Sequence, residues 1–194
     1  MGMTLFTTPI LAPILRFFSH WILKVIGWRC VGAIPKDINK CILIVAPHTS
    51  NWDFAYFILS VFELRLNLRV LIKHTLFVGP LGWFLRYCGG IPVDRRAASA
   101  RVRSLSDRLA DSESFVLLIT PEGTRSPNKN WKSGFYHMAQ EAGVPIVVAY
   151  LDAAIKEIGI DHVVNPTGDK DGDIKKIKAF YDTKQGVKPE NYAS

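Results

Sequence analysis

The chain has 194 residues, 48% of them hydrophobic, and a formal net charge of +7. This length is enough for one α/β domain with a sizeable core. The three cysteines, Cys30, Cys41 and Cys88, are too few and too widely spaced for a disulfide framework or a zinc motif, which excludes both classes. A basic, hydrophobic chain favours an anionic membrane surface, nucleic acid or an acidic protein as partner, although a basic protein without such a partner has the same composition.

Residues 11–28, LAPILRFFSHWILKVIGW, are apolar apart from one polar stripe. Positions four apart lie on one side of a helix, and here they carry Arg16, His20 and Lys24. These groups interrupt the run of about 20 apolar residues that a membrane-spanning helix needs, and the following WRCVGAIP is a poor cleavage site for a signal peptide. The pattern predicts an amphipathic helix within residues 1–30.

Two positions for this helix are compatible with its pattern. Its broad apolar face predicts a place in the membrane interface, with Trp21 and Trp28 at the depth of the lipid headgroups. The alternative is a helix packed on the core of the same chain or on a second copy. The interface is favoured, because the apolar face is wider than one packing partner usually covers.

From residue 41 onwards, apolar runs alternate with amphipathic segments. Strands are expected at residues 41–47, 68–73, 91–94, 115–120 and 145–151, and helices at residues 50–64, 80–89, 97–111 and 130–143. A hairpin of two short strands (155–160 and 162–167) and a last helix (171–184) follow. Strands that are apolar on both faces and alternate with helices predict a single α/β domain over residues 31–194, with a mostly parallel sheet flanked by helices.

Polar residues with catalytic potential follow the ends of four of these strands. His48 comes after the first strand, Lys73 ends the second, Asp94 and Arg95 end the third, and TPEGTRS (120–126) follows the fourth. In a parallel sheet the ligand site lies beyond the carboxyl ends of the strands. The pattern therefore places a functional site at this edge of the sheet.

His48 and Asp53 lie in APHTSNWDF, where a buried strand gives way to a helix. A carboxylate in the first turn of that helix is favoured by the helix dipole. By bonding one ring nitrogen of the preceding histidine, it can also fix the tautomer, leave the other nitrogen as a base and raise the basicity of the ring. The alternative is a turn histidine and an ordinary capping carboxylate, and the spacing alone does not separate the two.

The segment TPEGTRS is suited to an anion. Gly123 allows a turn with positive φ and a close approach of the backbone to a ligand, and successive N–H groups in such a turn bind anions. Arg125 adds a planar fork that matches a phosphate, with hydroxyls from Thr124 and Ser126 beside it. A plain surface turn has the same composition.

Taken together, four blocks resemble the lysophosphatidate acyltransferase family of glycerolipid acyltransferases. The blocks are PHTSNWD, GGIPVDR, TPEGTRS and VPIVVAY, and they follow the order and approximate spacing of that family over residues 48 to about 150. The resemblance implies that His48 is the base that deprotonates the acceptor hydroxyl and that Asp53 orients it. It implies an acceptor-phosphate site formed by Arg95, Glu122, Gly123, Thr124 and Arg125. Lys73 is a further candidate for the phosphate, and Pro145 is implied to shape the acyl pocket.

The implied reaction moves a fatty acyl group from an acyl thioester to a hydroxyl of a lysophospholipid or glycerol phosphate. A thioester is already activated, because a thiol of pKa ~8.5 leaves readily, so no acyl-enzyme, metal or other cofactor is expected. The donor is acyl-CoA or acyl-acyl carrier protein. The basic helix 97–111 suits either, or an anionic lipid, and a solvated helix face has the same pattern. We expect a peripheral or monotopic protein on the cytoplasmic face of a membrane, with the apolar segment 75–87 as a second contact and no nucleic-acid partner.

Two other functional classes are compatible with parts of this pattern. A metal-dependent hydrolase would use His48, Asp53, His74 and Glu122, although no tight pair of metal ligands such as H-x-x-x-H occurs and both arginines would be unused. A non-catalytic membrane or nucleic-acid binder would explain the charge and the aromatic residues but not His48 and Asp53 beside E-G-T-R. A serine hydrolase is weaker, since the chain has no G-x-S-x-G motif.

Overall fold

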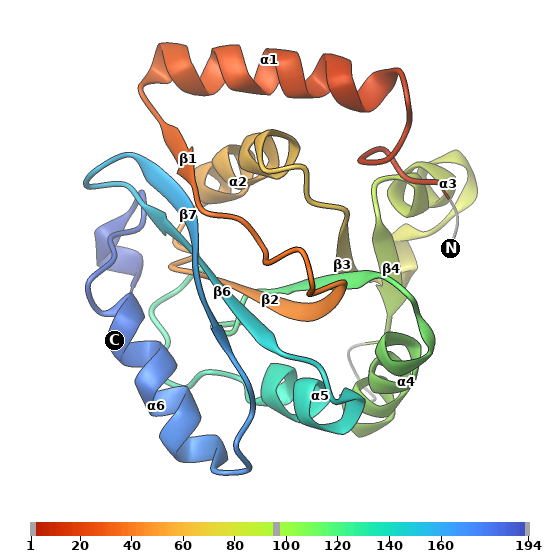
Figure 1. Cartoon of the computed structure of the whole chain (residues 1–194), viewed down its shortest axis with the longest axis vertical. Helices are drawn as coiled ribbons and strands as arrows, with labels where there is room; N and C mark the ends of the chain where they lie inside the picture. Colours follow the sequence, from red (N-terminus) through yellow and green to blue (C-terminus); the bar gives the residue numbers. More distant parts are fainter. Residues whose placement is uncertain (1–2, 95–97, 193–194) are drawn as a thin grey trace.

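The computed structural model describes residues 3–94 and 98–192, without the side chains of residues 98–101. One seven-stranded sheet forms the centre, with the strand order β1-β7-β6-β2-β5-β3-β4 (Figure 1). The strands are β1 (Arg29–Val31), β2 (Lys40–Ala46), β3 (Leu68–Lys73), β4 (Gly90–Val93), β5 (Phe115–Ile119), β6 (Ile146–Asp152) and β7 (Glu157–Val164). The predicted α/β class is confirmed.

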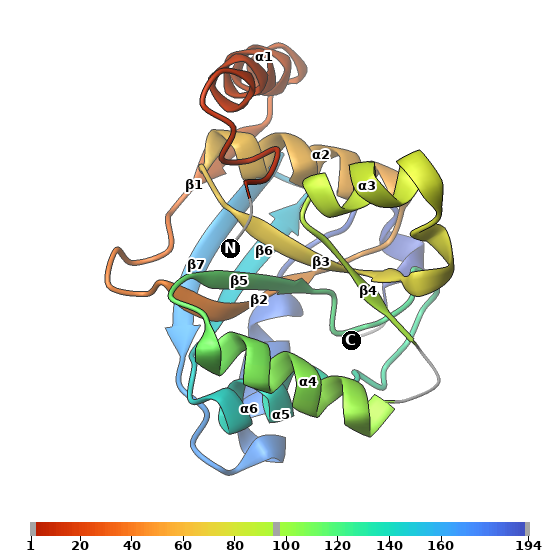
Figure 2. The same ribbon diagram turned by 90° about the vertical axis from the view of Figure 1, so that its right-hand side faces the viewer.

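Helices cover both faces of the sheet. They are α1 (Leu11–Ile26), α2 (Asn51–Glu63), α3 (Gly79–Tyr87), α4 (Ala98–Asp111), α5 (Gly134–Ala142) and α6 (Lys170–Tyr181), with short 3₁₀ turns η1 (His74–Leu76) and η2 (Pro189–Asn191). Helices α2 and α3 lie on one face, α4, α5 and α6 lie on the other, and α1 lies outside α2 as a further layer (Figure 2). The predicted helix from residue 130 begins only at Gly134, because Lys132 N–H donates to the Pro121 carbonyl in the preceding loop.

Strand β2 shows why the sheet is buried on both faces. Ile42, Ile44 and Ala46 point into the core beneath α4, α5 and α6, whereas Leu43 and Val45 point into the core beneath α1 and α2. Its parallel neighbours are β5 and β6, and β3 and β4 continue the parallel part of the sheet. This arrangement brings the carboxyl ends of these five strands to one edge.

The far edge of the sheet corrects one prediction. Residues 157–164 form the single strand β7, which pairs antiparallel with β6, so the hairpin predicted within residues 155–167 is wrong. Gly159 does not break the strand; it lies opposite Tyr150, and a Cβ there would come within 2.6 Å of the tyrosine ring. Strand β1 pairs parallel with β7 and was not predicted, because three residues at an edge carry too short a pattern.

Helix α1 divides into two faces. Ser19 and Leu23 are buried against the domain, and α1 packs mainly on α2. The opposite face is apolar and exposed, and it carries Ile14, Phe17, Phe18, Trp21, Ile22 and Val25. Trp28 is 8% exposed and stacks on Tyr56 with ring centroids 4.5 Å apart, so its predicted place at headgroup depth is wrong. Within the described residues, no helix is both long enough and apolar enough to cross a membrane.

The packing of α1 is testable by two substitutions on the same helix. Leu23→Ala should lower the free energy of unfolding by about 2–4 kcal/mol, because it removes a buried side chain. Val25→Ala, on the exposed face, should change it by no more than about 0.5 kcal/mol. Urea unfolding followed by circular dichroism measures both, and equal effects would contradict the packing described here.

Candidate active site

The loop after β2 carries the candidate base and is closed by a helix cap. Ser50 is the N-cap of α2, and its side chain accepts hydrogen bonds from the Trp52 and Asp53 amides at 3.1 and 3.4 Å. In return, Asp53 Oδ2 accepts from the Ser50 amide at 2.6 Å and from the Thr49 hydroxyl at 2.9 Å, as well as from the Thr49 amide. This capping box fixes both the start of α2 and the loop that holds His48.

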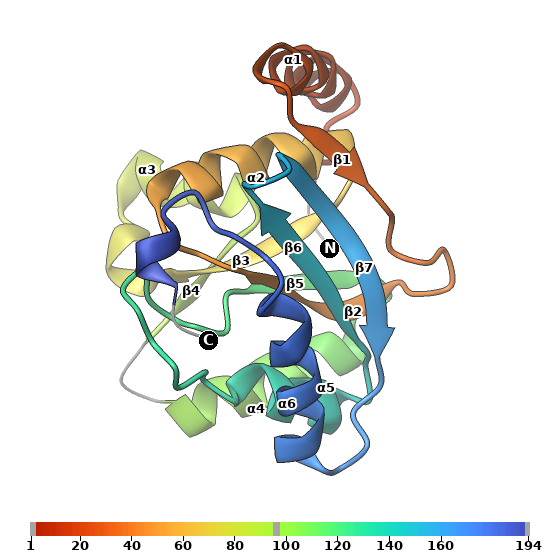
Figure 3. The same cartoon turned by 90° about the vertical axis from the view of Figure 1, so that its left-hand side faces the viewer.

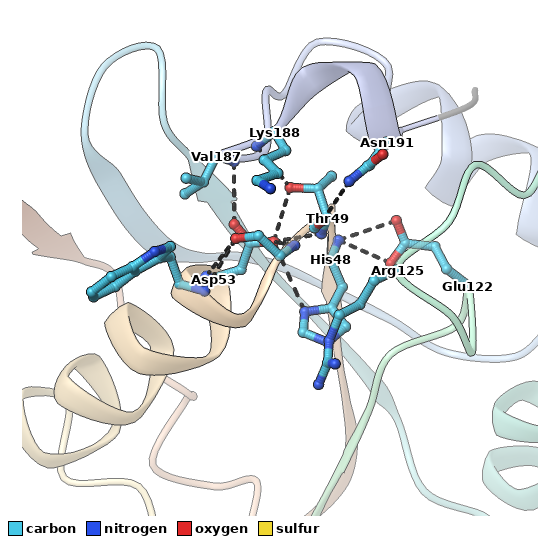
Figure 4. A network of polar contacts seen from close by, with 10 residues as sticks. His48, Thr49, Asp53, Glu122, Arg125, Val187, Lys188 and Asn191 are labelled. Carbon is cyan, nitrogen blue, oxygen red and sulfur yellow. Dashed lines mark hydrogen bonds and ion pairs between the residues drawn. The ribbon is translucent and has the colours of Figure 1, made fainter.

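The same carboxylate faces the histidine ring. His48 Nδ1 lies 4.0 Å from Asp53 Oδ2, with the Asp53 side chain only 3% exposed (Figure 4). This separation is too long for a hydrogen bond but close enough for a strong electrostatic effect. Asp53 therefore caps the helix and is the charged neighbour of His48, but the predicted bond from its carboxylate to the ring is not formed.

Arg125 contacts the other ring nitrogen. Arg125 Nε donates to His48 Nε2 over 3.2 Å, so Nε2 is the acceptor and the ring proton of neutral His48 belongs on Nδ1, facing Asp53. Burial lowers the pKa of His48 below its ordinary value of 6.5, the negative charge of Asp53 raises it, and the positive charge of Arg125 lowers it. The net decrease favours the neutral ring that a general base requires.

Glu122 supports the loop from the opposite side. Its carboxylate is 5% exposed and accepts the His48 amide hydrogen, with Oε2 and Oε1 at 3.0 and 3.1 Å. Burial raises its pKa to about 7, the hydrogen bond from His48 opposes this increase, and the charge of Asp53 adds to it. Glu122 was predicted to hold the acceptor phosphate, whereas its carboxylate faces the His48 backbone.

The turn that carries Arg125 has the geometry expected of it. Gly123 has φ of +67°, which confirms the predicted positive φ. The Thr124 hydroxyl accepts the Ser126 amide hydrogen at 3.2 Å and so stabilises the turn. A Cβ at Gly123 would come within 2.9 Å of Lys132 Nζ, so Lys132 lies directly against the turn. Lys132 was not predicted from the sequence, since it comes after the motif in a stretch without regular structure.

His48 and Arg125 open onto a cavity of about 440 Å³. His48, Arg125 and Lys132 line it together with Asp53 and the Gly123 turn. The rest of its wall is mainly apolar and includes Phe54, Phe57, Val70, Val93, Phe135 and Met138. The cavity therefore combines an imidazole and two positively charged side chains with an apolar wall.

Four predicted residues are not part of the cavity wall: Lys73, Glu122, Thr124 and Pro145. Lys73 ends β3 at the correct edge but is exposed and is not part of the cavity wall. Pro145 lies before the amino end of β6, where its carbonyl accepts from Ile42, so the prediction that it shapes an acyl pocket beside His48 is corrected. Arg95 lies outside the described residues. Among the described residues, no group of three His, Cys, Asp or Glu side chains is arranged to hold a metal ion.

Comparison with known proteins identifies the family. Residues 30–151, more than half of the chain, match the family model described as Acyltransferase. The chain belongs to the acyltransferase family. The matched part includes the loop of His48 and Asp53 and the turn of Arg125.

Two known proteins are similar to this chain. It is 30% identical over 115 residues to 1-acyl-sn-glycerol-3-phosphate acyltransferase from Streptococcus pneumoniae (strain ATCC BAA-255 / R6), a match that covers 59% of this chain and 42% of the relative. The aligned part thus spans less than half the length of that protein. The fold resembles the crystal structure of the 1-acyl-sn-glycerophosphate acyltransferase PlsC from Thermotoga maritima, with a TM-score of 0.60, 21% identity and coverage of 89% of this chain and 78% of that one.

The buried Glu122 predicts a pH-dependent stability. A carboxyl whose pKa is raised from 4.5 to about 7 by folding stabilises the native state below pH 4.5, and this contribution is lost as the pH rises towards 7. Relative to the parent, Glu122→Gln should therefore gain up to about 3 kcal/mol of unfolding free energy between pH 4.5 and pH 8.

Urea unfolding across this pH range measures the effect. Glu113→Gln, which changes an exposed glutamate, is the matched control and should follow the parent curve. A constant difference between Glu122→Gln and the parent at all pH values would show that folding does not raise the pKa of Glu122.

Proposed function

We propose that this acyltransferase moves a fatty acyl group from acyl-CoA or acyl-acyl carrier protein to a hydroxyl of a lysophospholipid or glycerol phosphate. His48 is the general base, and the reaction needs no acyl-enzyme and no cofactor. The observation that carries the proposal is the contact between His48 Nε2 and Arg125 Nε at the polar end of the cavity. A ring nitrogen able to accept a proton and a guanidinium suited to a phosphate thus lie within reach of one small ligand.

Arg125 links acceptor binding to activation of the base. Its Nε–H donates to His48 Nε2, whose lone pair a general base must use. An acceptor phosphate attracts the guanidinium more strongly than a neutral ring, because charge-assisted pairs are stronger than neutral ones. Transfer of Arg125 to the phosphate frees Nε2 for the acceptor hydroxyl. Lys132 supplies a second positive charge on the same cavity.

The chemical step then follows from the positions of these groups. His48 Nε2 takes the hydroxyl proton while the hydroxyl oxygen attacks the thioester carbonyl and forms the new C–O bond. The resulting imidazolium has its Nδ1–H towards Asp53 at 4.0 Å, which stabilises the positive charge. The C–S bond of the tetrahedral intermediate breaks, and the imidazolium returns the proton to the departing thiolate.

The cavity and the two faces of the sheet suggest where each substrate enters. The apolar wall near Phe57, Val93 and Met138 suits an acyl chain, in place of the predicted pocket at Pro145. The outer side of α4 carries exposed Arg103 and Arg108, which suit the phosphates of coenzyme A or an acidic carrier protein. Helix α4, proposed to meet the acyl donor, and the apolar face of α1 lie on opposite faces of the sheet (Figure 2).

The exposed apolar residues support a membrane-facing side. Within the described residues, the large exposed hydrophobic side chains come from the N-terminal segment, α1, the first turn of α2, η1, α3 and the β6–β7 turn, and none comes from α4, α5 or α6. On α1 and α3 they include Phe17 at 60% and Trp83 at 69% exposure. We propose that this side lies on the cytoplasmic surface of a membrane, with the protein peripheral or monotopic, because burying apolar area stabilises by ~25 cal/mol per Å².

The catalytic proposal is tested by substitution of the base. His48→Ala should lower acyl transfer at least ~10²-fold, and Asp53→Asn should also lower it because the imidazolium loses its counter-charge. Transfer from acyl-CoA and acyl-acyl carrier protein to lysophosphatidate is followed by mass spectrometry, with circular dichroism to establish folding. His137→Ala, an exposed histidine on α5, is the control. Near-parent turnover of folded His48→Ala, or no transfer by the parent at all, would refute the proposal.

The membrane proposal is tested by charges placed on the apolar side. Phe17→Glu and Trp83→Glu should each weaken co-sedimentation with anionic liposomes, because a carboxylate replaces apolar area at the contact. Ala179→Glu introduces the same charge at an exposed position of α6 and should bind as the parent does. If all three variants sediment like the parent, the side formed by α1 and α3 is not the membrane contact.

A further inference from the structure

A segment far from the family blocks reaches the catalytic loop. After α6 the chain turns back along the end of β6, and residues 185–191, here called the return segment, lie beside the start of α2 (Figure 3). The Ala153 amide donates to the Gln185 carbonyl at 2.7 Å, and Lys184 Nζ lies 3.8 Å from Asp152 Oδ2. These contacts anchor the beginning of the return segment to the end of β6.

The rest of the return segment binds the loop that holds His48. The Val187 amide donates to Asp53 Oδ1 at 3.2 Å, and the Lys188 amide donates to Thr49 Oγ1 at 3.0 Å. Asn191 Nδ2 donates to the Thr49 carbonyl at 3.0 Å (Figure 4). Thr49 is 1% exposed, so these bonds are made to a buried residue.

The two oxygens of Asp53 therefore have different partners. Oδ2, the oxygen nearer His48, is held by the loop itself through Thr49 and Ser50. Oδ1 accepts from Val187 of the return segment, 134 residues away in the sequence. The plane of a carboxylate is set by the donors on both of its oxygens, so the return segment fixes the direction in which Oδ2 faces the His48 ring.

We propose that the return segment is a positioning element of the active site, which holds Asp53 and Thr49 in the orientation that serves His48. Its bonds reach no reacting atom; they act through Asp53. The kinetic part of this inference rests on the proposed function, whereas the positioning itself does not.

Gly186 gives a second, independent sign of this role. A Cβ at Gly186 would lie 2.5 Å from both Oγ1 and Cγ2 of Thr49. This distance is shorter than any ordinary contact, so even an alanine must displace Thr49 or the segment. Absence of a side chain at Gly186 is what permits the backbone of the return segment to lie directly against the Thr49 side chain.

Two substitutions test the proposal from different sides. Asn191→Ala removes one hydrogen bond to Thr49, and Gly186→Ala pushes against the Thr49 side chain. Glu190→Gln, an exposed residue of the same η2 turn, is the matched control. If the parent transfers acyl groups, Asn191→Ala should lower kcat about fivefold, as expected for loss of one hydrogen bond. Gly186→Ala should lower kcat at least as much, because its Cβ displaces Thr49, and both KM values should stay unchanged in each variant.

A titration of His48 by NMR separates positioning from mere stability. The charged groups around the ring are Asp53 from α2 and Glu122 and Arg125 from the loop after β5, with Lys132 on the same cavity. His48 is one of five histidines, and His48→Ala assigns its signal. When Asp53 turns away, its effect of raising the pKa of His48 diminishes, so both variants should give a lower pKa than the parent and Glu190→Gln should not.

The outcomes remain distinguishable from those of the proposed function. A parent without acyl transfer would refute the proposed function, and the His48 titration would still decide the positioning. Folded Asn191→Ala and Gly186→Ala proteins with the parent pKa of His48 would overturn the inference. A lower pKa in both variants, with the control unchanged, would establish it.

Discussion

The hydrogen bond from Arg125 Nε to His48 Nε2, 3.2 Å long, joins two loops that are 77 residues apart in the sequence. It exists because β2 and β5 are parallel neighbours, so that the loops after them leave the sheet at the same edge. The bond holds a cation against a neutral ring, which is a weaker partner than a phosphate. The polar end of the cavity thus presents a guanidinium that a phosphate would bind more strongly than the imidazole does.

The loop around His48 depends on groups that perform two tasks at once. Asp53 caps α2 and faces the imidazole. The buried Glu122 carboxylate accepts the His48 amide hydrogen and lies close enough to Asp53 for their charges to interact. Two buried carboxyl groups this close repel each other when both are ionised, which adds to the raised pKa of Glu122. Burial of both carboxylates therefore lowers the stability of the loop. The return segment offsets this by supplying additional hydrogen-bond donors to the Asp53 carboxylate and to Thr49.

The sequence predicted those parts of the structure that depend on side-chain chemistry. The strands from β2 to β6 were recognisable because their residues are apolar on both faces of the sheet. His48, Asp53 and Arg125 were recognisable because they lie in known motifs that follow strands. The return segment could not be predicted, because Val187 and Lys188 act through backbone amides that every residue except proline carries. The position of Trp28 was predicted wrongly because the sequence pattern of a tryptophan at a lipid interface is the same as that of one stacked on a neighbouring ring, here Tyr56.

The central claim is that Arg125 captures the acceptor phosphate and thereby releases His48 as the base. The most direct test compares turnover of lysophosphatidate with that of a monoacylglycerol that lacks the phosphate, in the parent and in Arg125→Lys. We expect the parent to prefer the phosphorylated acceptor and Arg125→Lys to reduce this preference about tenfold, since lysine keeps the charge but loses the planar fork, with the KM for the donor unchanged. An equal preference in both proteins, or an equal change in the KM of donor and acceptor, would contradict it.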